Sequence, residues 1–97
     1  MEVTHTTFGT VSRDENETRV SGTQKDFCGW ANQPNNSWPC SALKMLDTLT
    51  ATFDSGGDLV GLRGGESSEL MADELNAWTS EVLIRAGYPN HPAIRTP

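Results

Sequence analysis

Residues 48–63 read TLTATFDSGGDLVGLR, and this stretch decides the fold that we expect. Leu49, Ala51 and Phe53 alternate with threonines, which is typical of a strand with one apolar and one polar face. The segment DSGGD at residues 54–58 has the composition of a turn, and its two glycines can adopt positive φ. Residues 59–63 return as the partner strand, so the pattern predicts a β-hairpin.

A long helix is expected next, over residues 67–86. Gly64-Gly65 ends the strand, a serine at 67 or 68 can cap the helix, and Gly87 with Pro89 ends it. At 100° per residue, one apolar stripe holds Met71, Leu75, Trp78, Val82 and Ala86, with Leu83 beside it. We expect this stripe to pack on the sheet.

The N-terminal segment 1–25 is expected to form a first hairpin, or else a mobile arm. Its strands are predicted over residues 2–9 and 19–23, with the polar segment 12–18 as the turn. Residues 26–40 are predicted to be a loop, and Ser41 to begin a short helix through Leu46. The tail 88–97 is too proline-rich for helix or central strand, and we expect it to be pinned to its own domain or to a neighbour.

These elements predict one α+β domain spanning residues 1–97. A small antiparallel sheet of two hairpins is covered on one face by one long C-terminal helix. A chain of 97 residues supports one modest hydrophobic core and no second one.

Composition narrows the classes of partner. The net charge of −6, from 13 acidic and 7 basic residues, opposes binding to nucleic acids, and the basic residues are spread along the chain. There is no apolar run long enough to span a membrane. The N-terminus MEVTHTTFGT lacks the pattern of a secretory signal, so we expect a cytoplasmic protein that binds neither nucleic acid nor membrane.

The two cysteines and two histidines are the candidate metal ligands. Cys28, Cys40, His5 and His91 do not occur in the close pairs that zinc sites use, so we expect no metal and no cofactor. A disulfide is geometrically possible, but in a reducing cytosol we favour two buried thiols. The histidines lie near opposite ends of the chain and no nucleophile motif is present, so we expect no enzyme.

The stretch FCGWANQPNNSWPCSAL at residues 27–43 is a candidate binding loop. Tryptophan and amide side chains are typical of recognition surfaces, and the candidate contacts are Trp30, Asn32, Gln33, Asn36 and Trp38. The alternative is that the tryptophans turn inward as anchors of the loop.

A second candidate surface lies on the predicted C-terminal helix. Leu70, Ala77 and Ile84 are seven residues apart, on the side opposite the apolar stripe. They form either a contact surface for self-association or for a protein partner, or an ordinary scatter of exposed apolar residues.

Cys28-Gly29-Trp30, Trp38-Pro39-Cys40-Ser41 and Asp58-Leu59-Val60 resemble segments of short uncharacterised proteins of actinobacteria and their phages, which carry a "WPC" segment. The resemblance covers residues 28–62 and implies a phage-encoded protein, but no activity. We therefore expect a non-enzymatic protein-interaction protein acting on a host protein in the host cytoplasm. The alternatives are a structural component of an assembly such as a virion, and a small zinc-binding or thiol-dependent protein.

Overall fold

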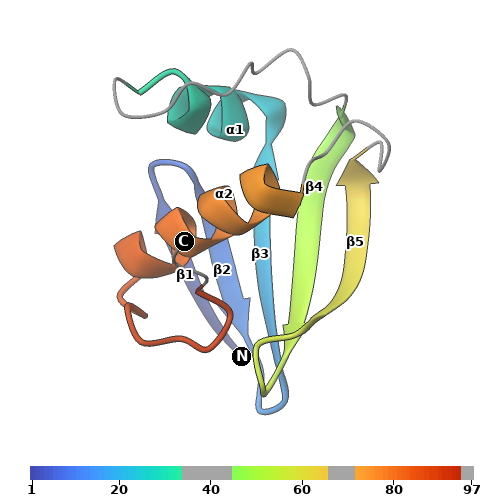
Figure 1. The fold of residues 1–97 in the computed structure, drawn as a ribbon, viewed down its shortest axis with the longest axis vertical. Coiled ribbons are helices and arrows are strands. Elements are labelled where there is room, and N and C mark those ends of the chain that lie inside the picture. The colour runs from blue at the N-terminus through green and yellow to red at the C-terminus, as the bar shows by residue number, and fades with distance from the viewer. Residues whose placement is uncertain (34–44, 66–71, 95–97) are drawn as a thin grey trace.

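The computed structural model describes residues 1–33, 45–65 and 72–94, and it contains one antiparallel sheet with two helices (Figure 1). The strands lie in the sheet in chain order: β1 (Glu2–Thr6), β2 (Gly9–Arg13), β3 (Glu17–Thr23), β4 (Met45–Asp54) and β5 (Leu59–Gly65). Helix α1 (Gln24–Ala31) follows β3, and α2 (Ala72–Arg85) follows β5. The predicted α+β class and the antiparallel sheet are confirmed.

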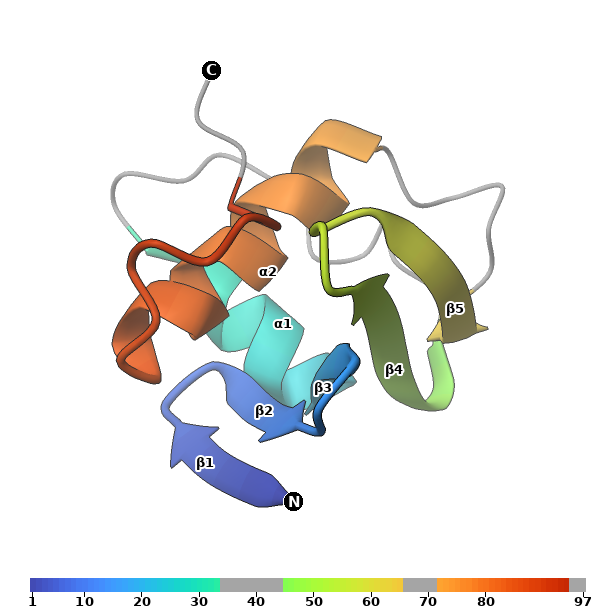
Figure 2. The same cartoon turned by 90° about the horizontal axis from the view of Figure 1, so that it is seen from below.

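Both helices cover the same face of the sheet. Helix α1 contacts β3 and β4, whereas α2 contacts β2 and β3. Figure 2 shows that the sheet curves around the two helices. The ring of Phe27 on α1 lies 6.1 Å from the ring of Trp78 on α2, edge to face. The prediction that one long C-terminal helix forms the whole cover is therefore wrong.

Helix α1 lies in the segment that we predicted to be a loop over residues 26–40. A capping box begins it: the Thr23 hydroxyl accepts from the Asp26 N–H at 3.2 Å, and the Asp26 carboxylate accepts from the Thr23 N–H at 2.9 Å. Burial of Phe27 and Trp30 in the core then outweighs the low helix propensity of Gly29. Residues 34–40 lie outside the described residues.

The N-terminal quarter forms three strands, so it is neither one hairpin nor an arm. The strand expected over residues 2–9 is interrupted because the Thr6 hydroxyl donates to the Gly9 carbonyl at 2.7 Å and accepts from the Phe8 N–H at 3.2 Å. Part of the polar segment 12–18 is also strand, since Val11 and Val20 pair across β2 and β3 and both are buried. Burial of Val11 and Val20 stabilises these strands, although the polar residues between them had indicated a turn.

The hairpin expected over residues 48–63 is present as β4 and β5. The Asp54 carboxylate closes its turn by accepting from the N–H groups of Gly56 at 3.0 Å and Asp58 at 2.9 Å. The pairing shifts between Thr52 and Phe53. Strand β4 begins at Met45, so the short helix predicted from Ser41 through Leu46 is wrong at its last two residues; residues 41–44 lie outside the described part.

Helix α2 ends where the sequence predicts. The Tyr88 N–H donates to the Leu83 carbonyl at 2.9 Å and the Gly87 N–H to the Ile84 carbonyl at 3.1 Å, while Gly87 adopts a φ of +97°. The predicted stripe is largely observed: Leu75, Trp78, Val82 and Leu83 are buried, and Ala86 is partly buried against them. Residues 67–71 lie outside the described part.

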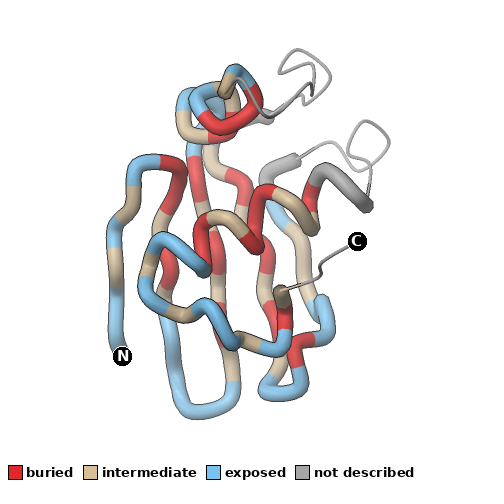
Figure 3. Tube along the Cα trace, turned by 60° about the vertical axis from the view of Figure 1, so that its left-hand side comes forward, coloured by how far each residue is buried: buried red, intermediate tan, exposed pale blue. Residues whose placement is uncertain are grey.

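Trp78 is the centre of the core. Its side chain is fully buried, and its indole N–H donates to the Phe8 carbonyl at 2.9 Å. Gly9 and Gly22 make room for the ring, because an added Cβ would lie 3.3 Å and 2.7 Å from it. Buried positions alternate with more exposed ones along the strands (Figure 3), so the covered face of the sheet holds the apolar residues.

The described part of the tail lies against its own domain, which is one of the two alternatives left open by the sequence. The His91 ring bonds to the Thr18 hydroxyl at 2.9 Å, and Ala93 is buried. Gly57, with a φ of +87°, lets the tail approach the β4–β5 turn, because an added Cβ would lie 2.4 Å from the Pro92 carbonyl carbon. The tail therefore closes the end of the core.

Candidate functional site

The face of the sheet that points away from both helices is built from two rows of residues in register across all five strands. One row holds Val3, Ser12, Arg19, Thr52 and Gly61. The other holds His5, Thr10, Ser21, Thr50 and Arg63. We call these ten residues the open face. Five of them carry hydroxyl groups, and two are arginines, so the open face can donate and accept many hydrogen bonds.

A hollow of about 410 Å³ lies on the β3–β5 part of the open face. Its lining residues are Glu17, Arg19, Thr50, Thr52, Val60, Gly61 and Arg63. Long side chains on β3 and β5 border threonines on β4, and Gly61 contributes no side chain. The hollow therefore follows from the sizes of the residues that the register brings together.

The two arginines of the hollow differ in their electrostatic surroundings. The Arg19 guanidinium lies 2.6 Å from the Glu17 carboxylate and 3.7 Å from that of Asp14, so its charge is largely balanced. Arg63 is exposed and has no carboxylate partner among the described residues. Of the two arginines in the hollow, Arg63 is therefore the one whose positive charge is available to a ligand.

The predicted tryptophan loop is only partly described. Trp30 is 2% exposed and packs 5.3 Å from the Phe27 ring, which is the inward orientation that the sequence left open as the alternative. Asn32 ends α1 by donating its N–H to the Cys28 carbonyl at 3.0 Å, and its side chain is exposed; Gln33 is half-buried. Asn36 and Trp38 lie outside the described residues.

Two of the three residues in the predicted row on the C-terminal helix are described, and they differ in exposure. Ile84 is 47% exposed, but Ala77 is partly buried and packs against the core. Leu70 lies outside the described residues.

The two histidines lie on opposite faces of the sheet. His5 is on the open face, where its Nδ1 lies 3.2 Å from the Thr10 hydroxyl. His91 lies on the covered side, against the buried Thr18. Among the described residues there is no group of three His, Cys, Asp or Glu side chains placed to hold a metal ion.

The His5–Thr10 contact does not have the surroundings of a catalytic pair. The imidazole is exposed on an edge strand, and no carboxylate among the described residues orients it. A hydroxyl nucleophile needs such an oriented base, shielded from bulk water. The described contact of this pair is therefore a hydrogen bond between two side chains of the open face.

His91 serves the fold. Its Nδ1 accepts from the Ala93 N–H at 3.0 Å, so in the neutral ring the proton lies on Nε2, which donates to the Thr18 hydroxyl. Burial, and secondarily the Arg13 guanidinium, lower the pKa of His91 below 6.5. A hollow of about 330 Å³ lies beside it, lined by Arg13 and residues 87–92. Because both ring nitrogens are used within the chain, this imidazole has none to offer a ligand.

The Arg13 side chain packs on the tail as well. Its guanidinium lies 4.9 Å from the centre of the Tyr88 ring, and the Tyr88 hydroxyl donates to the Glu2 carboxylate. This hydrogen bond, followed by burial, raises the pKa of Tyr88 above 10.0. These contacts tie the tail to β1 and β2.

Cys28 is disulfide-bonded, contrary to our expectation of two buried thiols. The residue is in α1, and its side chain is half-buried. The chain's other cysteine, Cys40, lies outside the described residues. The expected thiols followed from an assumed reducing compartment, which the residues themselves do not specify.

No family model, curated protein or solved structure matches this chain. Among the described residues, neither helix has the length and apolar character needed to cross a membrane. The sequence did not single out the open face as a candidate site, although the alternation of Thr48, Thr50 and Thr52 with apolar residues predicted one polar face.

Proposed function

We propose that this chain is a non-enzymatic protein-binding domain, and that the open face is its binding surface. The observation that carries the proposal is the hollow between β3 and β5, where Arg63 lies beside hydroxyl groups and without a carboxylate partner among the described residues. The covered face is filled by the core, so the open face is the part of the sheet available to a partner.

The residues of the open face support binding better than catalysis. Hydroxyl groups and guanidinium groups offer hydrogen bonds at fixed spacings set by the strand register. The face lacks tryptophan, tyrosine and phenylalanine, on which bases would stack, and the chain carries a net charge of −6. A protein partner fits this combination better than a nucleic acid.

The experiment is capture of partners from the native host, followed by mass spectrometry, with matched variants. Arg63→Glu on the open face should lose the partner, whereas Ile84→Glu on the exposed side of α2 should keep it. Circular dichroism checks that both variants fold. The reverse result, loss with Ile84→Glu and retention with Arg63→Glu, would move the binding surface to the helix.

A phage origin, with action on a host protein, remains part of the proposal and depends on the resemblance of residues 28–62. The disulfide at Cys28 favours a second candidate, a component of a virion, because disulfides persist on virion surfaces and are rare in a reducing cytoplasm. Alkylation of thiols in the native source before lysis separates the two locations: a protected Cys28 excludes the reducing cytoplasm, and an alkylated one excludes the virion candidate.

A further inference from the structure

Strand β5 is an edge of the sheet, and the open-face hollow lies directly beside it. It pairs only with β4 among the described strands, so a second row of its backbone groups faces outward. Leu59 and Val60 on this strand are 46% and 58% exposed. The described side chains of β5 include one charged group, that of Arg63, and no lysine, acid or proline.

The other edge strand is protected. Strand β1 has only five residues, and Glu2 at its start is engaged by the Tyr88 hydroxyl of the tail. Its side chains include an acid and a histidine. Addition of a strand is therefore favoured at β5 over β1.

Gly61 leaves a gap in the row of open-face side chains on β5. A Cβ built there would lie 3.6 Å from the Thr52 Cβ, an ordinary contact, so the position has room for a side chain that the chain does not supply. A strand added beside β5 would place alternate side chains over this gap and next to Arg63, since neighbouring strands lie about 4.8 Å apart.

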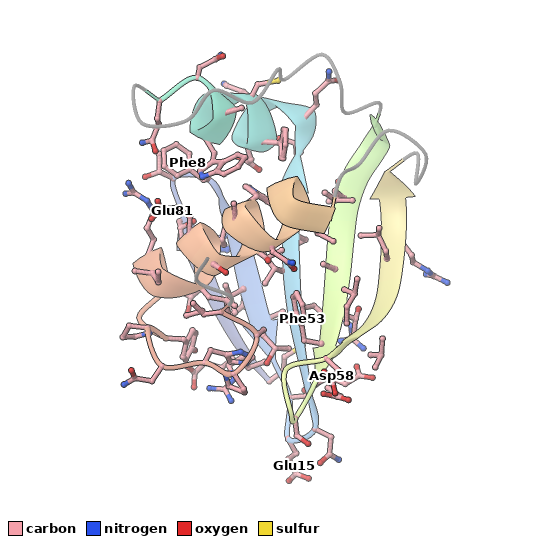
Figure 4. All side chains as sticks on the ribbon, in the orientation of Figure 1. Phe8, Glu15, Phe53, Asp58 and Glu81 are labelled. Atoms are coloured by element: carbon pink, nitrogen blue, oxygen red, sulfur yellow. The ribbon has the colours of Figure 1, made fainter. Side chains whose placement is uncertain are left out.

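The charges around the hollow indicate which charge the side chains of an added strand would carry. Acidic residues gather at one end of the molecule, on the turns beside β2–β3 and β4–β5, where Figure 4 shows Glu15 and Asp58. Arg63 lies on β5 away from that turn, and Arg19 is already paired with Glu17. A carboxylate beside Arg63 gains a charge-assisted hydrogen bond, whereas a cation there would be repelled.

We propose that the partner contributes an extended acidic segment that pairs with β5 as a sixth strand and places a carboxylate on Arg63 and a side chain over Gly61. This inference rests on the proposed function and names the chemistry of the partner. Backbone hydrogen bonds supply attraction that is independent of sequence, and the hollow selects the side chains.

The test uses the ¹⁵N-labelled full chain, titrated with a short end-blocked peptide of alternating threonine and glutamate. We expect amide shifts along β5 and at Thr50 and Thr52, weakened by added salt. Arg63→Glu should weaken binding by about tenfold or more, as expected for loss of a charge-assisted hydrogen bond. Gly61→Thr should also weaken binding, because it fills the gap.

Two control peptides separate the parts of the proposal. A peptide with lysine in place of glutamate should bind the unmodified chain less tightly and the Arg63→Glu variant more tightly. A glutamate peptide with N-methylated backbone amides should not shift β5. Equal binding of the lysine and glutamate peptides, or absence of shifts at β5 up to millimolar peptide, would overturn the inference.

The proposed function can survive that failure. If a native partner is captured and lost with Arg63→Glu, but the glutamate peptide does not bind, the open face is a binding surface and only the acidic strand is wrong. If neither the partner nor the peptide depends on Arg63, both proposals fail.

Discussion

The two faces of the sheet differ in what limits the choice of residue at each position. On the covered face, Trp78 is enclosed so closely that Gly9 and Gly22 have no space for a side chain. On the open face, Gly61 has that space and the chain leaves it empty. Glycine is therefore required by close packing on the covered face, whereas on the open face it leaves a gap. Substitutions on the two faces should differ sharply in their effect on the free energy of unfolding.

The largest effect is expected from Trp78→Ala. It removes a fully buried aromatic ring and its hydrogen bond to the Phe8 carbonyl, so the free energy of unfolding should fall by about 3–5 kcal/mol. Denaturant melts measure this, with Ile84→Ala as the exposed control on the same helix. A loss below about 1 kcal/mol would contradict the central place of Trp78 in the core.

The disulfide at Cys28 is expected to have the next largest effect. Reduction should lower the free energy of unfolding by about 2–4 kcal/mol, because it releases a constraint on the unfolded chain. Denaturant melts with and without reductant measure the difference. The Cys28→Ser variant should melt like the reduced chain, and reductant should not change its melt. Equal melts of the untreated and reduced chain would mean that this bond does not stabilise the packing on the covered face.

A matched pair of glycine substitutions compares the faces directly. Gly22→Ala should cost about 1–3 kcal/mol, because its Cβ would lie 2.7 Å from the Trp78 ring. Gly61→Ala should change stability by no more than about 1 kcal/mol, and in the stabilising direction, because it meets only ordinary contacts and restricts the unfolded chain. Similar losses from the two substitutions would show that the open face is packed as tightly as the core.

The smallest effect is expected from pH, through His91 on the covered side. Its folded-state pKa is lowered, so the unfolded chain binds a proton more readily than the folded chain. The contribution of the neutral ring is complete above pH 6.5 and decreases as the pH falls through the folded-state pKa. Denaturant melts between pH 7.5 and pH 5 should show that the free energy of unfolding falls less steeply with decreasing pH in His91→Gln than in the unmodified chain. An equally steep fall in both proteins would show that His91 is not its source.

Local patterns predicted those elements whose signals lie within a few residues. The alternation in TLTATF predicted β4, the glycines and aspartates of DSGGD predicted its turn, and Gly87 predicted the end of α2. Helix α1 was missed although Thr23 and Asp26 form a capping box, because the proline and asparagine content of the following residues was given more weight. In the N-terminal quarter, the strands predicted over residues 2–9 and 19–23 overlap β1 and β3, but β2 was missed because the polar residues 12–18 indicated a turn beside the buried Val11.

The sequence by itself determined the α+β class, the central hairpin and the apolar stripe of α2, because period and turn chemistry are local properties of the chain. Only the tertiary structure decided that two helices share one face, that Gly9 and Gly22 accommodate Trp78, and that Gly61 and Arg63 border a hollow beside a strand edge. These features depend on residues from strands far apart in the chain, and strand order and register, which local sequence does not encode, bring them together.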